Sequence, residues 1–158
     1  MKIHHLFAAT LVLVTAIPTA AQEKGAKRSD EKCSVVISFP GVGSKVAENG
    51  DARGTAKGLP VGSRLWILAH RMGLALWWPQ GGGEVSVPAA GEWLATVTYG
   101  TERDQGSKFE VAAIVVDEPT HASLTKWIAQ AEATGRYPGM SMPKTVDACS
   151  VSRVIVTR

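Results

Sequence analysis

The sequence predicts a mainly β domain that contains a single short helix. Three observations favour this fold class. Short apolar segments repeatedly alternate with a period of two, glycine is abundant at 16 of 158 residues, and only one stretch has the apolar spacing of a helix. A chain of this size is long enough to bury a real hydrophobic core.

The first predicted strand alternates Val35, Ile37 and Phe39 with smaller residues, and Pro40 ends it. A short, weak strand follows at residues 52–57. Residues 64–70 form the strongest strand signal in the chain, and both of its faces are mostly apolar. We therefore expect both faces of that strand to be covered. A tight turn leads into its expected hairpin partner at residues 74–80.

The second half of the chain repeats this pattern and adds the helix. Strands are predicted at residues 84–87, 92–99, 108–115 and 150–158. Between the last two, Leu124, Trp127, Ile128 and Ala131 are spaced i, i+3, i+4 and i+7, which is one apolar helix stripe. Asp117 or Thr120 can cap its start, and Gly135 can end it. We expect this stripe, Trp127 included, to pack on the outer face of a sheet.

Seven to eight short strands separated by turns are typical of an immunoglobulin-like β-sandwich, here with the helix inserted before the last strand. The two cysteines agree with this arrangement. Cys33 precedes the first predicted strand and Cys149 precedes the last. Parallel first and last strands would bring these positions together, so we expect a disulfide between them. The predicted domain covers residues 33–158.

The N-terminus has the three parts of a secretory signal peptide. Lys2 precedes an apolar run over residues 6–17, Pro18 ends the run, and small residues follow at Thr19 to Ala21. A membrane anchor is the alternative, but a run of 12 residues is shorter than the roughly 20 needed to span a bilayer. We expect a signal peptide at residues 1–21, a flexible leader at 22–32, and a periplasmic or secreted protein.

Charge gives little support to nucleic-acid binding. Removing 21 of 158 residues leaves 137, and removing Lys2 from 17 basic residues leaves 16 against 14 acidic ones, a net charge of +2. No run of five like charges occurs. We expect neither a nucleic-acid partner nor a membrane span in the mature chain.

Residues 50–158 resemble an immunoglobulin-like module of bacterial secreted and multidomain proteins. The similarity consists of a short series of motifs, namely residues 54–60 with their Gly-Leu-Pro turn, Leu65-Trp66, Trp78-Pro79-Gln80, Gly91-Glu92-Trp93, residues 109–117, and the terminal strand 153–158. The resemblance implies the fold and no particular activity, because the module has no assigned function. The cysteine pair and Trp77 are not features of that module.

The adjacent pair Trp77 and Trp78 is the strongest candidate for a binding site. Neighbours on a strand point to opposite faces, so one indole is expected in the core and the other, Trp78, at the surface. Together with Arg71 and Gln80, an exposed indole could anchor a protein partner or stack on a sugar ring. The alternative is that both indoles are covered and serve only the core. Trp66 and Trp93 lie within alternating strands and are expected in the core.

No catalytic or metal-binding motif stands out. His70, Asp117 and His121 have no recognised ligand spacing, and no G-x-S-x-G elbow or P-loop occurs. We therefore expect no cofactor, no metal and no enzyme activity. The leading hypothesis is a non-catalytic exported protein that recognises another periplasmic or secreted protein, a class that includes inhibitor and immunity proteins. The alternatives are a carbohydrate- or cell-wall-binding module that uses an exposed Trp and, last, a small hydrolase.

We predict that the mature chain begins at Gln22, because signal peptidases cleave after small residues such as Ala21. Intact-mass measurement of the protein recovered from the periplasm or the medium tests this. A mass that still includes residues 1–21 would contradict the prediction.

Overall fold

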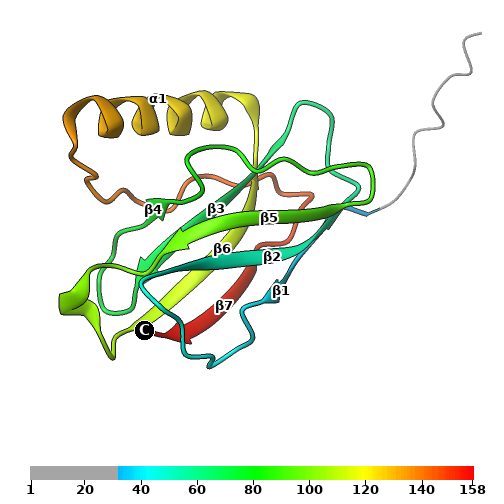
Figure 1. Ribbon diagram of the computed structural model, residues 1–158. Coiled ribbons are helices and arrows are strands. Elements are labelled where there is room, and N and C mark those ends of the chain that lie inside the picture. The colour runs from blue at the N-terminus through cyan, green and yellow to red at the C-terminus, as the bar shows by residue number, and fades with distance from the viewer. Residues whose placement is uncertain (1–31) are drawn as a thin grey trace, which may run out of the picture.

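The computed structural model describes residues 32–158, so the predicted signal peptide and nearly all of the leader lie outside the described residues. Within this range the chain forms seven strands, one α-helix and one short 3₁₀ helix (Figure 1). In chain order these are β1 (Ser34–Phe39), β2 (Asn49–Lys57), β3 (Arg64–Arg71), β4 (Trp78–Pro79), β5 (Glu92–Thr98), η1 (Glu102–Asp104), β6 (Lys108–Val116), α1 (Glu118–Thr134) and β7 (Ser152–Thr157). No helix among residues 32–158 is long and apolar enough to cross a membrane.

The strands form two antiparallel sheets. One sheet has three strands in the order β1-β2-β5, and the other has four in the order β4-β3-β6-β7. The α-helix stands between β6 and β7, as the sequence predicts. The prediction of a mainly β fold with one helix before the last strand is therefore confirmed.

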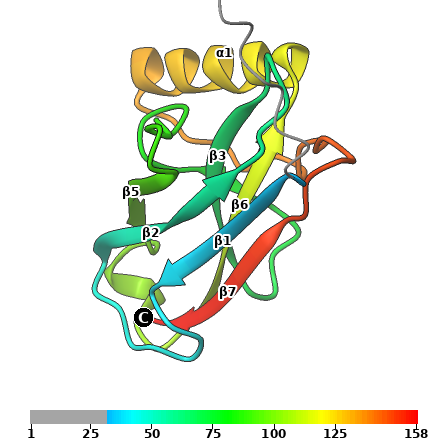
Figure 2. The same ribbon diagram turned by 90° about the vertical axis from the view of Figure 1, so that its right-hand side faces the viewer.

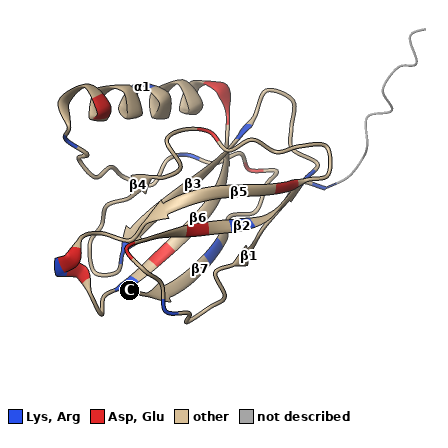
Figure 3. Cartoon of the chain, viewed as in Figure 1, with Lys and Arg blue, Asp and Glu red and all other residues tan. Residues whose placement is uncertain are grey.

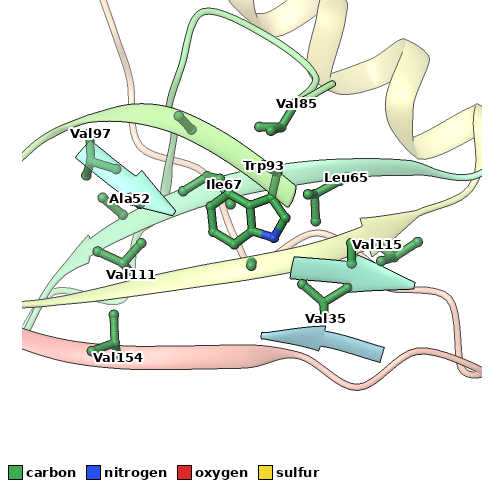
Figure 4. Packing of buried hydrophobic residues seen from close by; sticks show 14 of the residues in the cluster. Val35, Ala52, Leu65, Ile67, Val85, Trp93, Val97, Val111, Val115 and Val154 are labelled. Atoms are coloured by element: carbon green, nitrogen blue, oxygen red, sulfur yellow. The ribbon is translucent and has the colours of Figure 1, made fainter. Parts of the chain in front are cut away.

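The inward faces of both sheets build the main core. Alternate residues of each strand point into it, so the period-two pattern of the sequence becomes one layer of buried side chains. Trp93 lies among Leu65, Ile67 and Val115 in the middle of this layer (Figure 4). Gly54 makes room for it, since a Cβ atom there would lie 2.5 Å from the Trp93 ring.

A second core covers the outer face of β3 and β6. Trp66 and Ile114 are fully buried on this face, and Leu124 of α1 packs against them. Asp117 caps the helix by accepting a hydrogen bond from the Thr120 N–H, and Gly135 ends it in the left-handed conformation at φ 64°. The prediction that both faces of the strand at 64–70 are covered is thus confirmed.

Two predicted strands are shorter in the structure than in the sequence analysis. Of residues 74–80, only Trp78 and Pro79 pair with β3, and of residues 84–87 only Val85 forms a bridge, to Leu65. Pro79 has no N–H to continue a ladder, and Gly81 to Gly83 all adopt positive φ. The backbone pairing along the β4 side of β3 is therefore interrupted between Pro79 and Val85.

The first and last strands close one side of the molecule. After β1 the chain crosses to the other sheet, where the Val46 N–H donates to the Thr157 carbonyl at 2.9 Å and Lys45 forms a parallel bridge with Thr157. β1 and β7 run side by side (Figure 2). Cys33 and Cys149 are disulfide-bonded with their Cα atoms 4.9 Å apart, so the predicted pairing is confirmed.

Replacing both Cys33 and Cys149 with Ser is expected to lower the free energy of unfolding by about 2–5 kcal/mol, because the bond closes a loop with a sequence separation of 116 residues. Denaturant titration followed by circular dichroism measures the loss. The folded spectrum of the variant should match the parent, and equal stability of the two proteins would contradict the prediction.

Candidate functional site

The side of the molecule opposite the disulfide is open and carries a groove of about 740 Å³. Here β4 ends one sheet and β5 ends the other, and α1 overhangs the gap between them (Figure 1). We call this the aromatic groove. It is lined by Ala69, Arg71, Leu74, Trp78, Pro79, Gln80, Gly81, Gly82, Thr96, Thr98, Gly100, Thr101, Asp104, Phe109, Trp127, Ile128, Glu132 and Tyr137.

Three of the four residues predicted for a binding site line this groove together. They are Arg71, Trp78 and Gln80, which come from the end of β3, from β4 and from the turn after it. Trp78 is half-buried, so part of its ring is open to an incoming group. Their convergence follows from the pairing of β3 with β4, which places Trp78 opposite Ala69.

Trp77 points to the other face and belongs to the second core. It is 7% exposed, and its ring stacks on His70 with the ring centres 4.7 Å apart. The Arg153 guanidinium lies 5.4 Å from the ring centre and is held by Glu110 at 3.0 Å. The two neighbouring indoles therefore divide as strand alternation predicts, with Trp77 in the core and Trp78 on the groove.

Gln80 lines the groove but is buried, at 8% exposure. Its Nε2 donates to the Trp78 carbonyl at 2.9 Å, and its Oε1 accepts from the Thr98 N–H at 2.8 Å. One side chain thus links β4 of one sheet to β5 of the other. Gln80 is buried and each end of its amide makes a hydrogen bond within the protein, so it is not the exposed hydrogen-bonding partner that a surface patch would use.

The end of the groove near α1 is aromatic. Trp78 Nε1 donates to the Tyr137 carbonyl at 2.9 Å, and Trp127 Nε1 donates to the Pro138 carbonyl at 3.1 Å. The Trp127 and Tyr137 rings meet edge to face at 6.1 Å. At Gly139 a Cβ atom would lie 2.8 Å from the Trp78 ring, so only glycine allows this close approach.

The burial of Trp127 differs from the prediction. The helix stripe predicts a buried Trp127, whereas the residue is half-buried and lines the groove. Leu124 and Ala131 take the central positions of the buried stripe. Trp127 lies at its margin, where the chain returning through Tyr137 and Pro138 covers only part of the ring.

The opposite end of the groove is polar, and its two charged side chains, Arg71 and Asp104, form an ion pair. Arg71 Nε lies 3.2 Å from the Asp104 carboxylate, which also accepts from the Thr101 N–H at 2.8 Å. That backbone hydrogen bond, followed by the Thr101 hydroxyl and by Arg71 and Arg158, holds the pKa of Asp104 below its usual value. Asp104 is therefore an ionised anchor for the loop after β5.

Most polar groups along the groove are satisfied by the protein itself. The indole N–H groups, the Gln80 amide and the Thr98 hydroxyl each have an internal partner. Charges of both signs are interspersed along the chain (Figure 3). Of the charged residues that line the groove, only Glu132 lacks an ion-pair partner within residues 32–158. The groove therefore presents aromatic and aliphatic surface, together with the Glu132 carboxylate, which has no ion-pair partner among residues 32–158.

The other titratable residues considered from sequence have structural roles. Asp117 caps α1, His70 donates from Nδ1 to the Leu76 carbonyl at 2.9 Å, and the His121 ring lies 5.8 Å from Trp66. Over residues 32–158, no group of three or more His, Cys, Asp or Glu is arranged to hold a metal ion. His121 Nδ1 also lies 3.7 Å from the Glu84 carboxylate, which pairs with Arg64.

Sequence reasoning missed Trp127, Glu132, Tyr137 and Asp104 as groove residues. Asp104 is 26 positions from Trp78 in the sequence, and the other three residues are 49 or more positions from it. No periodic pattern in the sequence shows that these distant residues line the same groove as Trp78. Tyr137, at the end of the helix and next to Pro138, carries the one available signal, since it is an aromatic residue outside any predicted core stripe.

We predict that Gln80→Ala lowers the free energy of unfolding by about 1–3 kcal/mol, because the part-buried hydrogen bond between the Thr98 N–H and the buried Gln80 amide is lost. Thermal and denaturant unfolding measure this. Thr96→Ala on the same strand is the matched control, since the Thr96 side chain is exposed and should change stability little. Equal stability of Gln80→Ala and the parent would show that Gln80 does not link the sheets.

Comparison with known proteins does not assign a role to this site. No protein-family model matches the sequence, and no curated protein matches it. The chemistry of the aromatic groove therefore carries the functional conclusion.

Proposed function

We propose that this chain is a non-catalytic, exported binding protein that recognises another periplasmic or secreted protein through the aromatic groove. The observation that supports this most directly is the groove itself, which is concave and largely apolar, has a volume of about 740 Å³ and lies on a two-sheet scaffold. Concave apolar sites with a few placed polar groups are the usual binding sites of small ligands, and apolar grooves also take apolar segments of partner proteins. The half-buried Trp78 is the central anchor.

Export is part of the proposal and rests on two features. Cys33 and Cys149 form a disulfide, a bond that persists mainly in oxidising compartments outside the cytoplasm. Residues 1–21 have the composition of a secretory signal peptide. Together they favour a periplasmic or secreted location.

We further propose that the fold is an immunoglobulin-like β-sandwich. The two sheets of three and four antiparallel strands have the general arrangement of such domains. The passage of the chain from β1 to a pairing with β7 also agrees with it. In this class the two ends and the open edges of the sheets are common recognition surfaces.

A protein partner suits the groove better than a carbohydrate. Sugars are bound through many hydrogen bonds to their hydroxyl groups, and each unpaired polar group of a buried ligand costs free energy. In the groove the indole N–H groups of Trp78 and Trp127 and the amide of Gln80 are already engaged. Large apolar side chains are among the exposed lining residues, with Leu74 at 42% and Tyr137 at 56% exposure, beside the threonines of β5 and Glu132. Apolar side chains of a protein need no such donors.

The carbohydrate alternative keeps one observation in its favour, which is the partly open ring of Trp78 on the groove wall. A flat indole face can stack on a sugar ring. Retention of the mature protein on purified peptidoglycan or polysaccharide, abolished by Trp78→Ala, would support that alternative over a protein partner.

Trp78→Ala is expected to weaken partner binding by at least about 2 kcal/mol, roughly 30-fold, with little change in melting temperature. Trp77→Ala is the matched variant: it removes a core indole of 7% exposure, so it should lower the melting temperature by several degrees and leave the binding of folded protein intact.

The experiment begins with capture on the immobilised mature protein from periplasmic extract or culture medium, with Trp78→Ala as the parallel control. Each partner that depends on Trp78 is then purified and titrated against the parent and both variants. If both variants melt several degrees lower while binding is intact, the groove loses its role, and the loop at residues 101–107 becomes the next candidate.

A further inference from the structure

The free edge of β5 carries unpaired backbone groups. Among residues 32–158, β5 ends the three-stranded sheet and pairs only with β2. The Tyr99 N–H, just beyond the strand, donates to the Glu48 carbonyl on the β2 side, whereas the Thr98 N–H turns to Gln80 on the other side. Because backbone groups alternate along a strand, the N–H and C=O groups of Leu94 and Thr96 also point away from β2.

The edge of β5 lacks the prolines, bulges and central charges that usually protect sheet edges, and the neighbouring chain approaches it at Gln80 and Gly81. Proteins protect such edges with prolines, bulges, charged side chains or very short strands. β4 has a length of two residues, contains Pro79 and is followed by the turn at residues 81–83. β5 has seven residues and no proline, and its single charged residue, Glu92, stands at its start. The edge at Leu94 and Thr96 is therefore competent to pair with another strand.

The edge and the aromatic groove are continuous. Thr96 and Thr98 belong to β5 and also line the groove. A strand that paired with Leu94 and Thr96 would run beside the groove, and side chains from alternate positions of that strand would enter it. Backbone pairing and apolar side-chain contacts would thus act on the same segment.

We propose that β5 binds an extended segment of the partner protein as an additional strand, with alternate apolar side chains of that segment in the aromatic groove. This inference rests on the proposed function and names the form of its partner. Main-chain hydrogen bonds provide affinity in this binding mode, and the side chains in the groove provide specificity.

The negative charge of Glu132 in the groove indicates which residue type the partner segment carries at one position. Glu132 is the lining charge without an ion partner among residues 32–158, and it lies at the end where Trp78, Trp127 and Tyr137 gather. Carboxylates attract ammonium and guanidinium groups, and these cations also bind to the faces of aromatic rings. The segment therefore carries a Lys or Arg at the end that lies beside α1.

The first experiment selects peptides from a random dodecapeptide display library on the immobilised mature protein. The expected consensus has apolar residues at alternate positions and one Lys or Arg towards an end. A synthetic peptide of this consensus is then titrated against the parent, Thr96→Pro, Thr96→Val and Glu132→Gln by calorimetry. Thr96→Pro removes one edge N–H at a position where proline is compatible with an edge strand. Thr96→Val keeps that N–H and the side-chain shape.

We expect Thr96→Pro to weaken peptide binding about 10-fold or more and Thr96→Val to change it less than about 3-fold. Glu132→Gln should weaken binding about 3- to 10-fold at low salt, and the difference should shrink at high salt. Amide hydrogen exchange of the parent protein provides a measurement that needs no variant. On peptide addition, the amides of Leu94 and Thr96 should become protected.

The outcomes separate this inference from the proposed function. If Trp78→Ala abolishes peptide binding while the amides of Leu94 and Thr96 stay unprotected, the groove retains its role and strand addition is wrong. If no peptide is enriched while the capture experiment yields a partner that depends on Trp78, strand addition is wrong and the proposed function stands. If Trp78→Ala binds the peptide as tightly as the parent, the proposed function itself is wrong. If sedimentation finds a dimer of the parent that Thr96→Pro dissociates, the edge binds a second copy of this chain, which overturns the inference.

Discussion

β3 and β6 are buried on both faces, and the rest of the architecture follows from the need to cover them. Their inward residues, such as Ile67 and Val111, are fully buried against the three-stranded sheet. Their outward residues, such as Trp66 and Ile114, are also fully buried. Apolar surface of this extent is strongly destabilising when exposed to water. Two separate covers are required, and the second one is α1 with the chain that follows it.

The two sheets are joined differently on their two sides, and the proposed binding surface lies on the less closed side. Where β1 and β7 adjoin, the sheets are joined by backbone hydrogen bonds and by the Cys33–Cys149 disulfide. Where β4 and β5 end their sheets, a single buried side chain, Gln80, links them. α1 overhangs this second side without sealing it. The aromatic groove and the free backbone edge of β5 are consequences of the same incomplete closure.

The groove is organised for apolar contact because its polar atoms serve the fold. Trp78 and Trp127 direct their N–H groups to the carbonyls of Tyr137 and Pro138, which holds both rings in place. Rings fixed in this way lose little entropy when a partner binds, and preorganisation of this kind favours affinity. The ion pair between Arg71 and Asp104 holds the other end of the groove. Among residues 32–158, the Glu132 carboxylate has no ion-pair partner, and the outward backbone groups of Leu94 and Thr96 are not paired with β2. In the binding mode proposed above, these groups select the partner.

The local elements and the two faces of each strand could be predicted from the amino-acid sequence. Alternation at residues 64–70 predicted two covered faces, Asp117 and Gly135 marked the helix ends, and the adjacent Trp77 and Trp78 were expected to point apart. These features depend on residues close in sequence, where backbone geometry alone sets the direction of each side chain. The disulfide was also predictable, because two cysteines in a chain with a predicted signal peptide leave one intramolecular pairing.

The set of elements that border the groove depends on the tertiary structure and could not be predicted from the sequence. The partial exposure of Trp127, the burial of Gln80 and the approach of Tyr137 to Trp78 all depend on how α1 and the returning chain pack beside β4. Periodicity states which residues share a face, but it does not state which faces meet or how far one element extends past another. Those relations arise from packing between residues distant in sequence, where shape and burial outweigh local preference.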